Sequence, residues 1–202
     1  PAVEEIITRV EFTWKLSDQV VAELPGSSPF WIVRREKLDA LLLNNALIAG
    51  AELICPFLTT KIKKKGDLWQ IKDENNRTIE ARAIVIANGS NSTFPRTFGL
   101  GPRTQHHAAT TSVRLEGNGN LSEGTSYFEF GLVHHGFAWA FPLSGAVNVG
   151  VGTFIGRHAS DSNEVLQQLL PTLGFDPKAG KRINSSLRVW NGHHDLHGDG
   201  VV

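Results

Sequence analysis

Residues 136–142 read Gly-Phe-Ala-Trp-Ala-Phe-Pro, and residues 146–152, after a short turn, read Ala-Val-Asn-Val-Gly-Val-Gly. Side chains of a β-strand alternate between its two faces, so Phe137, Trp139 and Phe141 share one face. Three neighbouring rings offer a wide apolar surface at little entropic cost, as a large apolar ligand requires. The alternative is that these rings belong to an ordinary hydrophobic core.

The sequence around this stretch predicts a mostly antiparallel arrangement of strands. We expect strands at residues 112–115, 126–133, 137–142, 146–154 and 188–190. A helix is expected between the last two, because Asp161 and Glu164 have the spacing of a capping box and Gly174 follows as a stop. Its apolar stripe consists of Val165, Leu166, Leu169, Leu170 and Leu173.

The first half of the chain predicts strands, one helix and a meander. The strands are expected at residues 6–15, 20–24, 30–33 and 51–54, and the meander at 59–64, 68–72 and 78–82. The helix at 35–49 would end at Gly50, and its stripe is Leu38, Leu41, Leu42, Ala46 and Ala49.

The continuously apolar residues 83–87 are typical of a strand that is covered on both faces, and most such strands are parallel. This strand leads into a small polar loop that starts at Asn88 and Gly89. Ligands of open α/β sheets bind at such carboxyl ends. A plain Asn-Gly turn is the alternative.

Composition restricts the class of protein. The chain has 202 residues, 20 Lys+Arg against 20 Asp+Glu, and 41% hydrophobic residues, so it can bury a core and its balanced charge argues against a dedicated nucleic-acid binder. No apolar run approaches the roughly 20 residues that span a bilayer. Cys55 is the single cysteine and cannot form an internal disulfide. Since the chain lacks Met and begins at Pro1, we expect a piece of a longer protein.

Several other motifs predict no chemistry. His193, Asp195 and His197 would share a face of an extended segment, but no second ligand cluster supports a metal. Lysines 61 and 63–65 suit a solvated hairpin tip. Residues 150–156 come within one residue of a dinucleotide fingerprint, yet they continue as a strand where a helix is required. Cys55, at an apolar strand end, is expected to act as a small hydrophobe.

Three segments, taken in order, carry a resemblance to a known family. Residues 33–39, then a helix and residues 49–53, resemble the Arg-x-x-Phe-Asp-x-x-Leu…Ala-x-x-x-Gly-Ala segment of flavoprotein oxidoreductases related to para-hydroxybenzoate hydroxylase. Residues 82–92, followed by Arg96, are similar to their Ala-Asp-Gly-x-x-Ser loop. Phe137-x-Trp139-x-Phe141-Pro142 and the later Gly150-x-Gly152 match the (Tyr/Phe)-x-Trp-x-Phe-Pro…Gly-x-Gly signature of geranylgeranyl reductases.

The resemblance implies an FAD-dependent enzyme in which reduced flavin passes hydride to an isoprenoid double bond. It implies that Arg35 contacts the flavin nucleotide and that Asn88 and Gly89 lie near the phosphates of FAD or NAD(P)H. The substrate pocket would be lined by Phe137, Trp139, Phe141 and Pro142, with Gly150 and Gly152 allowing close approach. The sequence departs from the family at Asn88, where Asp is usual, and at Phe137, where Tyr is frequent.

Two flavin-binding segments of the family have no match in the chain. They are the amino-terminal Gly-x-Gly-x-x-Gly unit and the later Gly-Asp-Ala segment; we interpret Gly198-Asp199 as a turn before a further strand. We therefore expect an α+β fold that forms part of an α/β flavoprotein. Residues 1–33 would be strands of the substrate domain, 34–101 a partial FAD-binding domain, and 102–202 the substrate-binding sheet domain.

As a whole, the resemblance predicts a cytoplasmic reductase that takes electrons from NADPH or another donor and meets a lipid-like substrate at the membrane periphery. This piece alone would be inactive, since the cofactor carries the redox step, and its exposed apolar surface would favour self-association. Two alternatives stay open. One is an FAD-dependent aromatic monooxygenase or halogenase, although halogenases carry Trp-x-Trp-x-Ile-Pro. The other is a non-enzymatic module that binds an apolar ligand.

Overall fold

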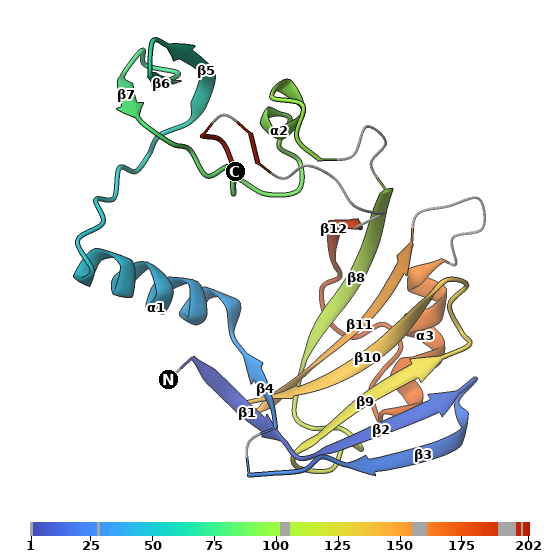
Figure 1. Cartoon of the computed structure of the whole chain (residues 1–202). Coiled ribbons are helices and arrows are strands. Elements are labelled where there is room, and N and C mark those ends of the chain that lie inside the picture. Colours follow the sequence, from blue (N-terminus) through green and yellow to red (C-terminus); the bar gives the residue numbers. More distant parts are fainter. Residues whose placement is uncertain (1, 28, 102–105, 155–160, 190–196, 199) are drawn as a thin grey trace. The chain divides into compact units, whose positions relative to one another are not determined.

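The computed structural model describes residues 2–27, 29–101, 106–154, 161–189, 197–198 and 200–202. Figure 1 labels its elements: β1 (Val3–Ile7), β2 (Arg9–Trp14), β3 (Ser17–Glu23), β4 (Phe30–Val33), α1 (Arg35–Ile48), β5 (Thr59–Lys65), β6 (Leu68–Asp73), β7 (Thr78–Ala81), α2 (Phe94–Thr97), β8 (His106–Glu116), β9 (Thr125–Phe130), β10 (Gly136–Leu143), β11 (Ala146–Phe154), α3 (Ser162–Thr172) and β12 (Ile183–Val189). The chain divides into two compact units, residues 1–45 with 106–189 and residues 46–105 with 190–202.

The first unit is built on a seven-stranded sheet. Among the described residues its order is β12-β8-β11-β10-β9-β2-β3, and every neighbouring pair is antiparallel except β2 and β9. A separate antiparallel pair is formed by β1 and β4. The predicted α+β class and the antiparallel strands around residues 136–154 are therefore confirmed.

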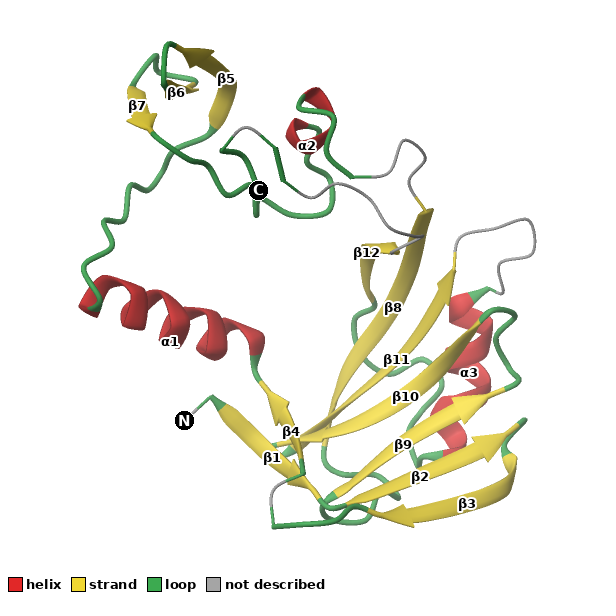
Figure 2. Ribbon diagram, viewed as in Figure 1, coloured by secondary structure: helices red, strands yellow, loops and turns green. Residues whose placement is uncertain are grey.

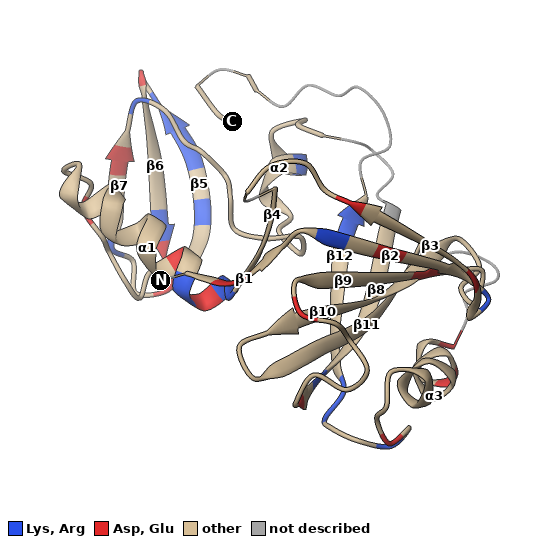
Figure 3. Cartoon of the chain, turned by 90° about the horizontal axis from the view of Figure 1, so that it is seen from below, with Lys and Arg blue, Asp and Glu red and all other residues tan. Residues whose placement is uncertain are grey.

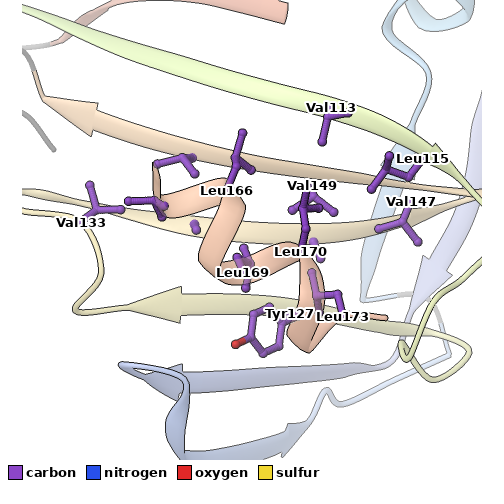
Figure 4. Close-up of a cluster of buried hydrophobic side chains, with 14 residues drawn as sticks. Val113, Leu115, Tyr127, Val133, Val147, Val149, Leu166, Leu169, Leu170 and Leu173 are labelled. Atoms are coloured by element: carbon purple, nitrogen blue, oxygen red, sulfur yellow. The ribbon is translucent and has the colours of Figure 1, made fainter. Parts of the chain in front are cut away.

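Helix α3 covers one face of this sheet (Figure 2). It begins after Asp161, whose carboxylate accepts a hydrogen bond of 2.8 Å from the Asn163 amide, and Gly174, with φ +81°, follows its end. The predicted stripe of this helix is buried: Val165, Leu166, Leu169, Leu170 and Leu173. Figure 4 shows the four leucines of this stripe facing valines of β8 and β11, such as Val113 and Val149. This contact is the main core of the unit.

A buried polar cluster lies on the same face, beside the β2–β3 turn. Glu129 is fully buried. Its Oε2 accepts hydrogen bonds from the Thr13 hydroxyl, from the Leu16 amide at 3.1 Å and from the Tyr127 hydroxyl at 3.3 Å. Leu16 has a positive φ of 61°, which a residue with a Cβ rarely adopts. The buried carboxylate thus anchors an unfavourable turn to β9.

Tyr127 provides a spectroscopic test of this cluster. Burial, followed by the nearby charge of Glu129, raises the pKa of its phenol to about 12. A pKa raised in the folded state gives stability that is fully present below the unfolded pKa of 10.0 and is lost as the pH rises toward about 12. We expect a loss of about 2 to 3 kcal/mol across that window.

Because Tyr127 is the only tyrosine, near-ultraviolet tyrosinate absorbance during a pH titration reports it directly. Urea unfolding at each pH, compared with Tyr127→Phe, isolates its share of the stability. A tyrosinate midpoint near 10 in the folded chain would contradict the buried cluster.

The second unit contains the predicted meander as the antiparallel sheet β5-β6-β7. Its turns lie where expected, at Gly66 (φ +60°) and Asn76 (φ +62°). The carboxylate of Asp73 closes the second turn by accepting from the amides of Asn75 and Arg77 at 2.9 and 2.8 Å. A small core joins this sheet to later residues through Trp69, Leu100 and Val201.

Residues 83–87 are less covered than predicted. Ile84 and Ile86 pack against the small core, but Val85 is 75% exposed, so the expectation of cover on both faces is wrong for the described residues. Ile84 does pair in parallel with Val201, and its amide donates to the Gly200 carbonyl at 2.8 Å. The parallel pairing is thus confirmed, but only as an isolated bridge at Ile84, so residues 83–87 do not form the predicted strand. After Gly198, where a further strand was expected, Val201 forms isolated bridges alone.

Two further expectations need correction. Residues 51–54 form no strand. Helix α1 matches the predicted helix to within one residue, and the Gly50 amide closes it on the Leu47 carbonyl at 3.0 Å, but none of its residues is buried. An apolar stripe predicts burial only where another element covers it, and no described element covers this one. No helix among the described residues is long and apolar enough to cross a membrane.

Candidate functional site

The two faces of β10 differ as the alternation predicts. Ala138, Ala140 and Pro142 are buried, and the two alanines pack in the core beneath α3. Phe137, Trp139 and Phe141 point to the opposite face, which α3 does not cover. Their neighbouring ring centroids are each 6.0 Å apart along the strand.

Glycines of the neighbouring strand make room for the central ring. Trp139 is directly paired with Gly150 across β10 and β11. A Cβ built on Gly150 would overlap ring atoms of Trp139, and one on Gly152 would lie 3.3 Å from its Cζ3. The indole Nε1 donates to Asn148 Oδ1 at 3.0 Å. The indole therefore lies across β11 in a fixed orientation, and what approaches Gly150 closely is Trp139 itself.

Rings from neighbouring strands extend this surface. Phe128 of β9 lies 5.4 Å from Phe141 and 5.9 Å from Phe137, measured between ring centroids. At the other end, Phe30 of β4 meets Phe141 edge-on at 6.3 Å. That end is closed by a small core of Ile7, Val10 and Ile32. The surface is thus sealed near Phe141 and open near Phe137.

The open part forms a groove of about 490 Å³, within the range of small-molecule sites. Phe137, Phe154 and Leu187 along it are 38, 52 and 53% exposed, so it is not a sealed interior. Arg188 is the only ionisable residue among the described residues that line it. The groove is lined by Ala108 and Thr110 of β8, Phe128 of β9, Gly136, Phe137, Trp139 and Phe141 of β10, residues 152–154 of β11 and residues 187–189 of β12.

The structure separates Pro142 from the three rings. It lies on the other side of β10, where it lines a polar recess of about 290 Å³ with Glu5, Glu123 and Ser144. Gly150 is buried beneath the indole, whereas Gly152 lines the groove.

The residues expected near a flavin belong to both units. Arg35 lies at the start of α1 in the first unit, exposed, and its Nε donates to Asp39 at 2.7 Å, which raises the pKa of Arg35. Asn88 and Gly89 lie in an exposed loop of the second unit. Gly89 has φ +91°, and a Cβ added there would meet no atom within 4 Å. An approaching anion could therefore reach this backbone.

The structure describes part of the motifs that were set aside on sequence grounds. The described residues contain no group of three potential metal ligands, and His193 and Asp195 lie outside them. The described part of residues 150–156 continues β11 to Phe154, so this segment forms no nucleotide loop there. The lysines of β5, coloured blue in Figure 3, are exposed, and Cys55 is a free, exposed thiol.

The sequence analysis did not identify the residues that strand register places beside the three rings of β10. Asn148 orients Trp139, Phe128 joins its ring to the wall, and Leu187 forms the far edge. The one usable signal was the spacing from Asn148 to Gly150 and Gly152, which places all three on one face of β11.

Comparison with solved structures defines the class of fold. The chain superimposes on a geranylgeranyl bacteriochlorophyll reductase-like protein of Thermoplasma acidophilum with a TM-score of 0.79 and 20% identity, covering 98% of this chain and 54% of that one. It also superimposes on the halogenase PltM in complex with phloroglucinol and FAD, with a TM-score of 0.67 and 16% identity over 93% of this chain and 44% of that one. The fold is that of flavoprotein oxidoreductases.

Comparison with curated sequences points to one branch of this class. The chain is 26% identical over 167 residues to digeranylgeranylglycerophospholipid reductase 1 of Methanopyrus kandleri, covering 75% of this chain and 44% of the relative. The resemblance to geranylgeranyl reductases is therefore confirmed. The chain spans less than half the length of the curated relatives it matches. No model of a known protein family matches it.

The contact between Trp139 and Gly150 predicts that alanine substitutions at Gly150 and Gly152 will lower stability by unequal amounts. Gly150→Ala should destabilise the chain by about 1 to 3 kcal/mol, because the new methyl group displaces the indole and breaks its bond to Asn148. Gly152→Ala, where the ring has more room, should cost less. Urea unfolding measures both.

A double-mutant cycle provides the control. In a Trp139→Ala background the Gly150→Ala substitution should cost less than about 0.5 kcal/mol, because the clash is gone. An equal cost in both backgrounds would show that the ring does not lie on Gly150.

Proposed function

We propose that this chain is the substrate-binding part of an FAD-dependent oxidoreductase that reduces carbon–carbon double bonds of an isoprenoid lipid. The open aromatic groove is the observation that carries the proposal. The groove supplies a long apolar surface on one face of the sheet, and α3 already stabilises the sheet from the other face. The rings of the groove are therefore not needed to form the core beneath α3. The similarity to digeranylgeranylglycerophospholipid reductases supports this class of substrate.

The residues present fit a flavin nucleotide in two places. The open backbone at Gly89 can approach a phosphate, and Arg35 at the start of α1 offers a guanidinium that is exposed to solvent. Asn88, which replaces the family's carboxylate, adds no negative charge beside such a phosphate. FAD, when bound and reduced, supplies the hydride for the reaction; NADPH is the electron donor that we propose.

The groove residues bind and position the substrate. Reduction adds a hydride and a proton across the double bond. Phe137, Trp139 and Phe141 would hold the chain by apolar contact and exclude water from it. Among the described residues that line the groove, none carries a carboxyl, imidazole, thiol or phenol group, so the proton would come from elsewhere.

The same proposal accounts for the exposed apolar side chains of α1: Leu41, Leu42, Leu43, Leu47 and Ile48. Apolar surface of this kind is normally covered. We propose that further flavin-domain chain covers it in the whole enzyme and that a second copy does so when this chain is alone. The whole enzyme would be cytoplasmic and would meet its lipid substrate at the periphery of a membrane.

The halogenase alternative rests on a shared fold, which by itself assigns no chemistry. Phe141-Pro142 stands where the halogenase pattern has Ile-Pro. We therefore favour the reductase.

Trp139→Ala tests the groove as the isoprenoid site. We expect it to weaken the binding of geranylgeraniol, measured by isothermal titration calorimetry, by about tenfold or more, because a central aromatic contact is lost. Trp14→Ala is the matched control, since this exposed tryptophan of β2 does not line the groove. Equal affinities for the two variants would exclude the groove.

The reaction itself is tested on the full-length product of the reading frame that contains this chain. With NADPH and FAD, mass spectrometry should detect hydrogen gained at the double bonds of a geranylgeranyl lipid. Halogenation or hydroxylation of an aromatic substrate, without any saturation, would establish the alternative.

A further inference from the structure

A second recess, of about 240 Å³, adjoins the groove on the same face of the sheet and shares Phe141 with it. Strand register explains the position. Arg114 of β8 is paired with Asn148 of β11, which is paired with Phe141 of β10. This row follows directly on the row that contains Gly150 and Trp139, about 7 Å along the strands. Leu143 of β10 and residues 32–34, in and just after β4, complete the recess.

The recess is cationic. Arg34 and Arg114 both line it. Arg34 Nε lies 2.9 Å from Glu4 Oε1, and Lys37 Nζ lies 3.4 Å from the same oxygen. The Glu4 side chain is only 3% exposed. Burial alone would raise the pKa of Glu4, but the hydrogen bonds and charges of Arg34 and Lys37 outweigh it and lower that pKa. One carboxylate is thus shared by two cations, which leaves a net positive charge.

The guanidinium of Arg114 carries a positive charge that no other described side chain neutralises. In the described part of the chain its guanidinium has no hydrogen bond and no ion pair. The nearest acidic residue on its own face of β8 is Glu116, two positions along and exposed, with no ion pair to it among the described residues. A guanidinium that is exposed and lies beside an apolar groove is suited to bind an anionic oxygen of a ligand.

Asn148 connects the recess to the groove. Its Oδ1 accepts the indole hydrogen bond of Trp139 at 3.0 Å, so its amide nitrogen is the end left to donate. No described residue accepts from that nitrogen, and the side chain lines the recess. The same side chain can therefore orient the aromatic wall and donate to an anion.

From these observations we infer that the recess binds the phosphate group of an isoprenoid phosphate whose hydrocarbon chain lies in the aromatic groove. Arg114 and the Asn148 amide would donate to the phosphate oxygens, and Arg34, just after β4, would add positive charge. The inference rests on the proposed function, because it needs the groove to hold the isoprenoid. It adds that the head group lies at the closed, Phe141 end and the chain extends toward Phe137.

Binding of three probes to wild type and to Arg114→Gln tests the inference by isothermal titration calorimetry. The probes are geranylgeranyl monophosphate, geranylgeraniol and inorganic phosphate. Arg114→Gln should weaken the binding of the monophosphate by about tenfold or more, since charge-assisted hydrogen bonds are lost. It should leave the alcohol unchanged, and that unchanged affinity also shows that the variant is folded.

Glu116→Gln is the matched control, because it removes an exposed charge from the same face of β8. We expect the monophosphate to bind to it as tightly as to wild type or slightly more tightly. Arg114→Lys should retain part of the affinity, since it keeps the charge and loses the planar donor pair.

The outcomes separate this inference from the function on which it rests. If the alcohol and the monophosphate both bind and Arg114→Gln weakens neither, the head-group site is excluded and the groove stands. If neither binds to wild type, both proposals fail. If inorganic phosphate binds as tightly as the monophosphate, the recess is a site for free phosphate and the lipid head group is excluded.

Discussion

The arrangement of the candidate site depends on one contact, the indole of Trp139 lying on the bare backbone of Gly150. Only glycine allows this, because a Cβ at that position would occupy the space of the ring. The bond from Nε1 to Asn148 fixes the ring in the plane of the contact. The ring therefore lies over β11 and does not project into the groove. The groove consequently keeps enough depth to hold a ligand.

The two faces of the sheet have different roles in this arrangement. One face stabilises the unit, and the other is available for binding. Helix α3 and the valines of β8 and β11 form a dense core on one face. Because this core is complete, the rings on the other face can stay partly exposed. The β1–β4 pair closes that face at the Phe141 end alone. An elongated ligand would thus have one closed end and one open end, with the cationic recess beside the closed one.

Local patterns predicted much of this unit. The alternation in residues 136–142 placed three rings on one face of β10, and the stripe from Val165 to Leu173 gave the buried side of α3. The sequence pattern could not show which residues of neighbouring strands lie opposite one another. The roles of Asn148, Arg114 and Phe128 therefore emerged only from strand register. Pro142 shares the motif with the rings, but the alternation that unites them places it on the opposite face.

The second unit and α1 show the limit of reasoning from apolar content. Val85 and most leucines of α1 have the pattern of buried residues, yet they are exposed in the part of the chain that the structure describes. Whether an apolar side chain is buried depends on which other elements pack against it. A sequence pattern indicates only its tendency to be buried. The flavin-binding roles of Arg35, Asn88 and Gly89 stay predictions, since their local geometry fits an anion without identifying one.

Photoaffinity labelling with a diazirine-bearing geranylgeranyl analogue tests the central claim most directly, because it asks where the isoprenoid lies. Labelled peptides mapped by mass spectrometry should come from β10 and β12, with unlabelled geranylgeraniol suppressing the signal. Labelling confined to the exposed leucines of α1, or labelling that excess geranylgeraniol does not suppress, would contradict the account.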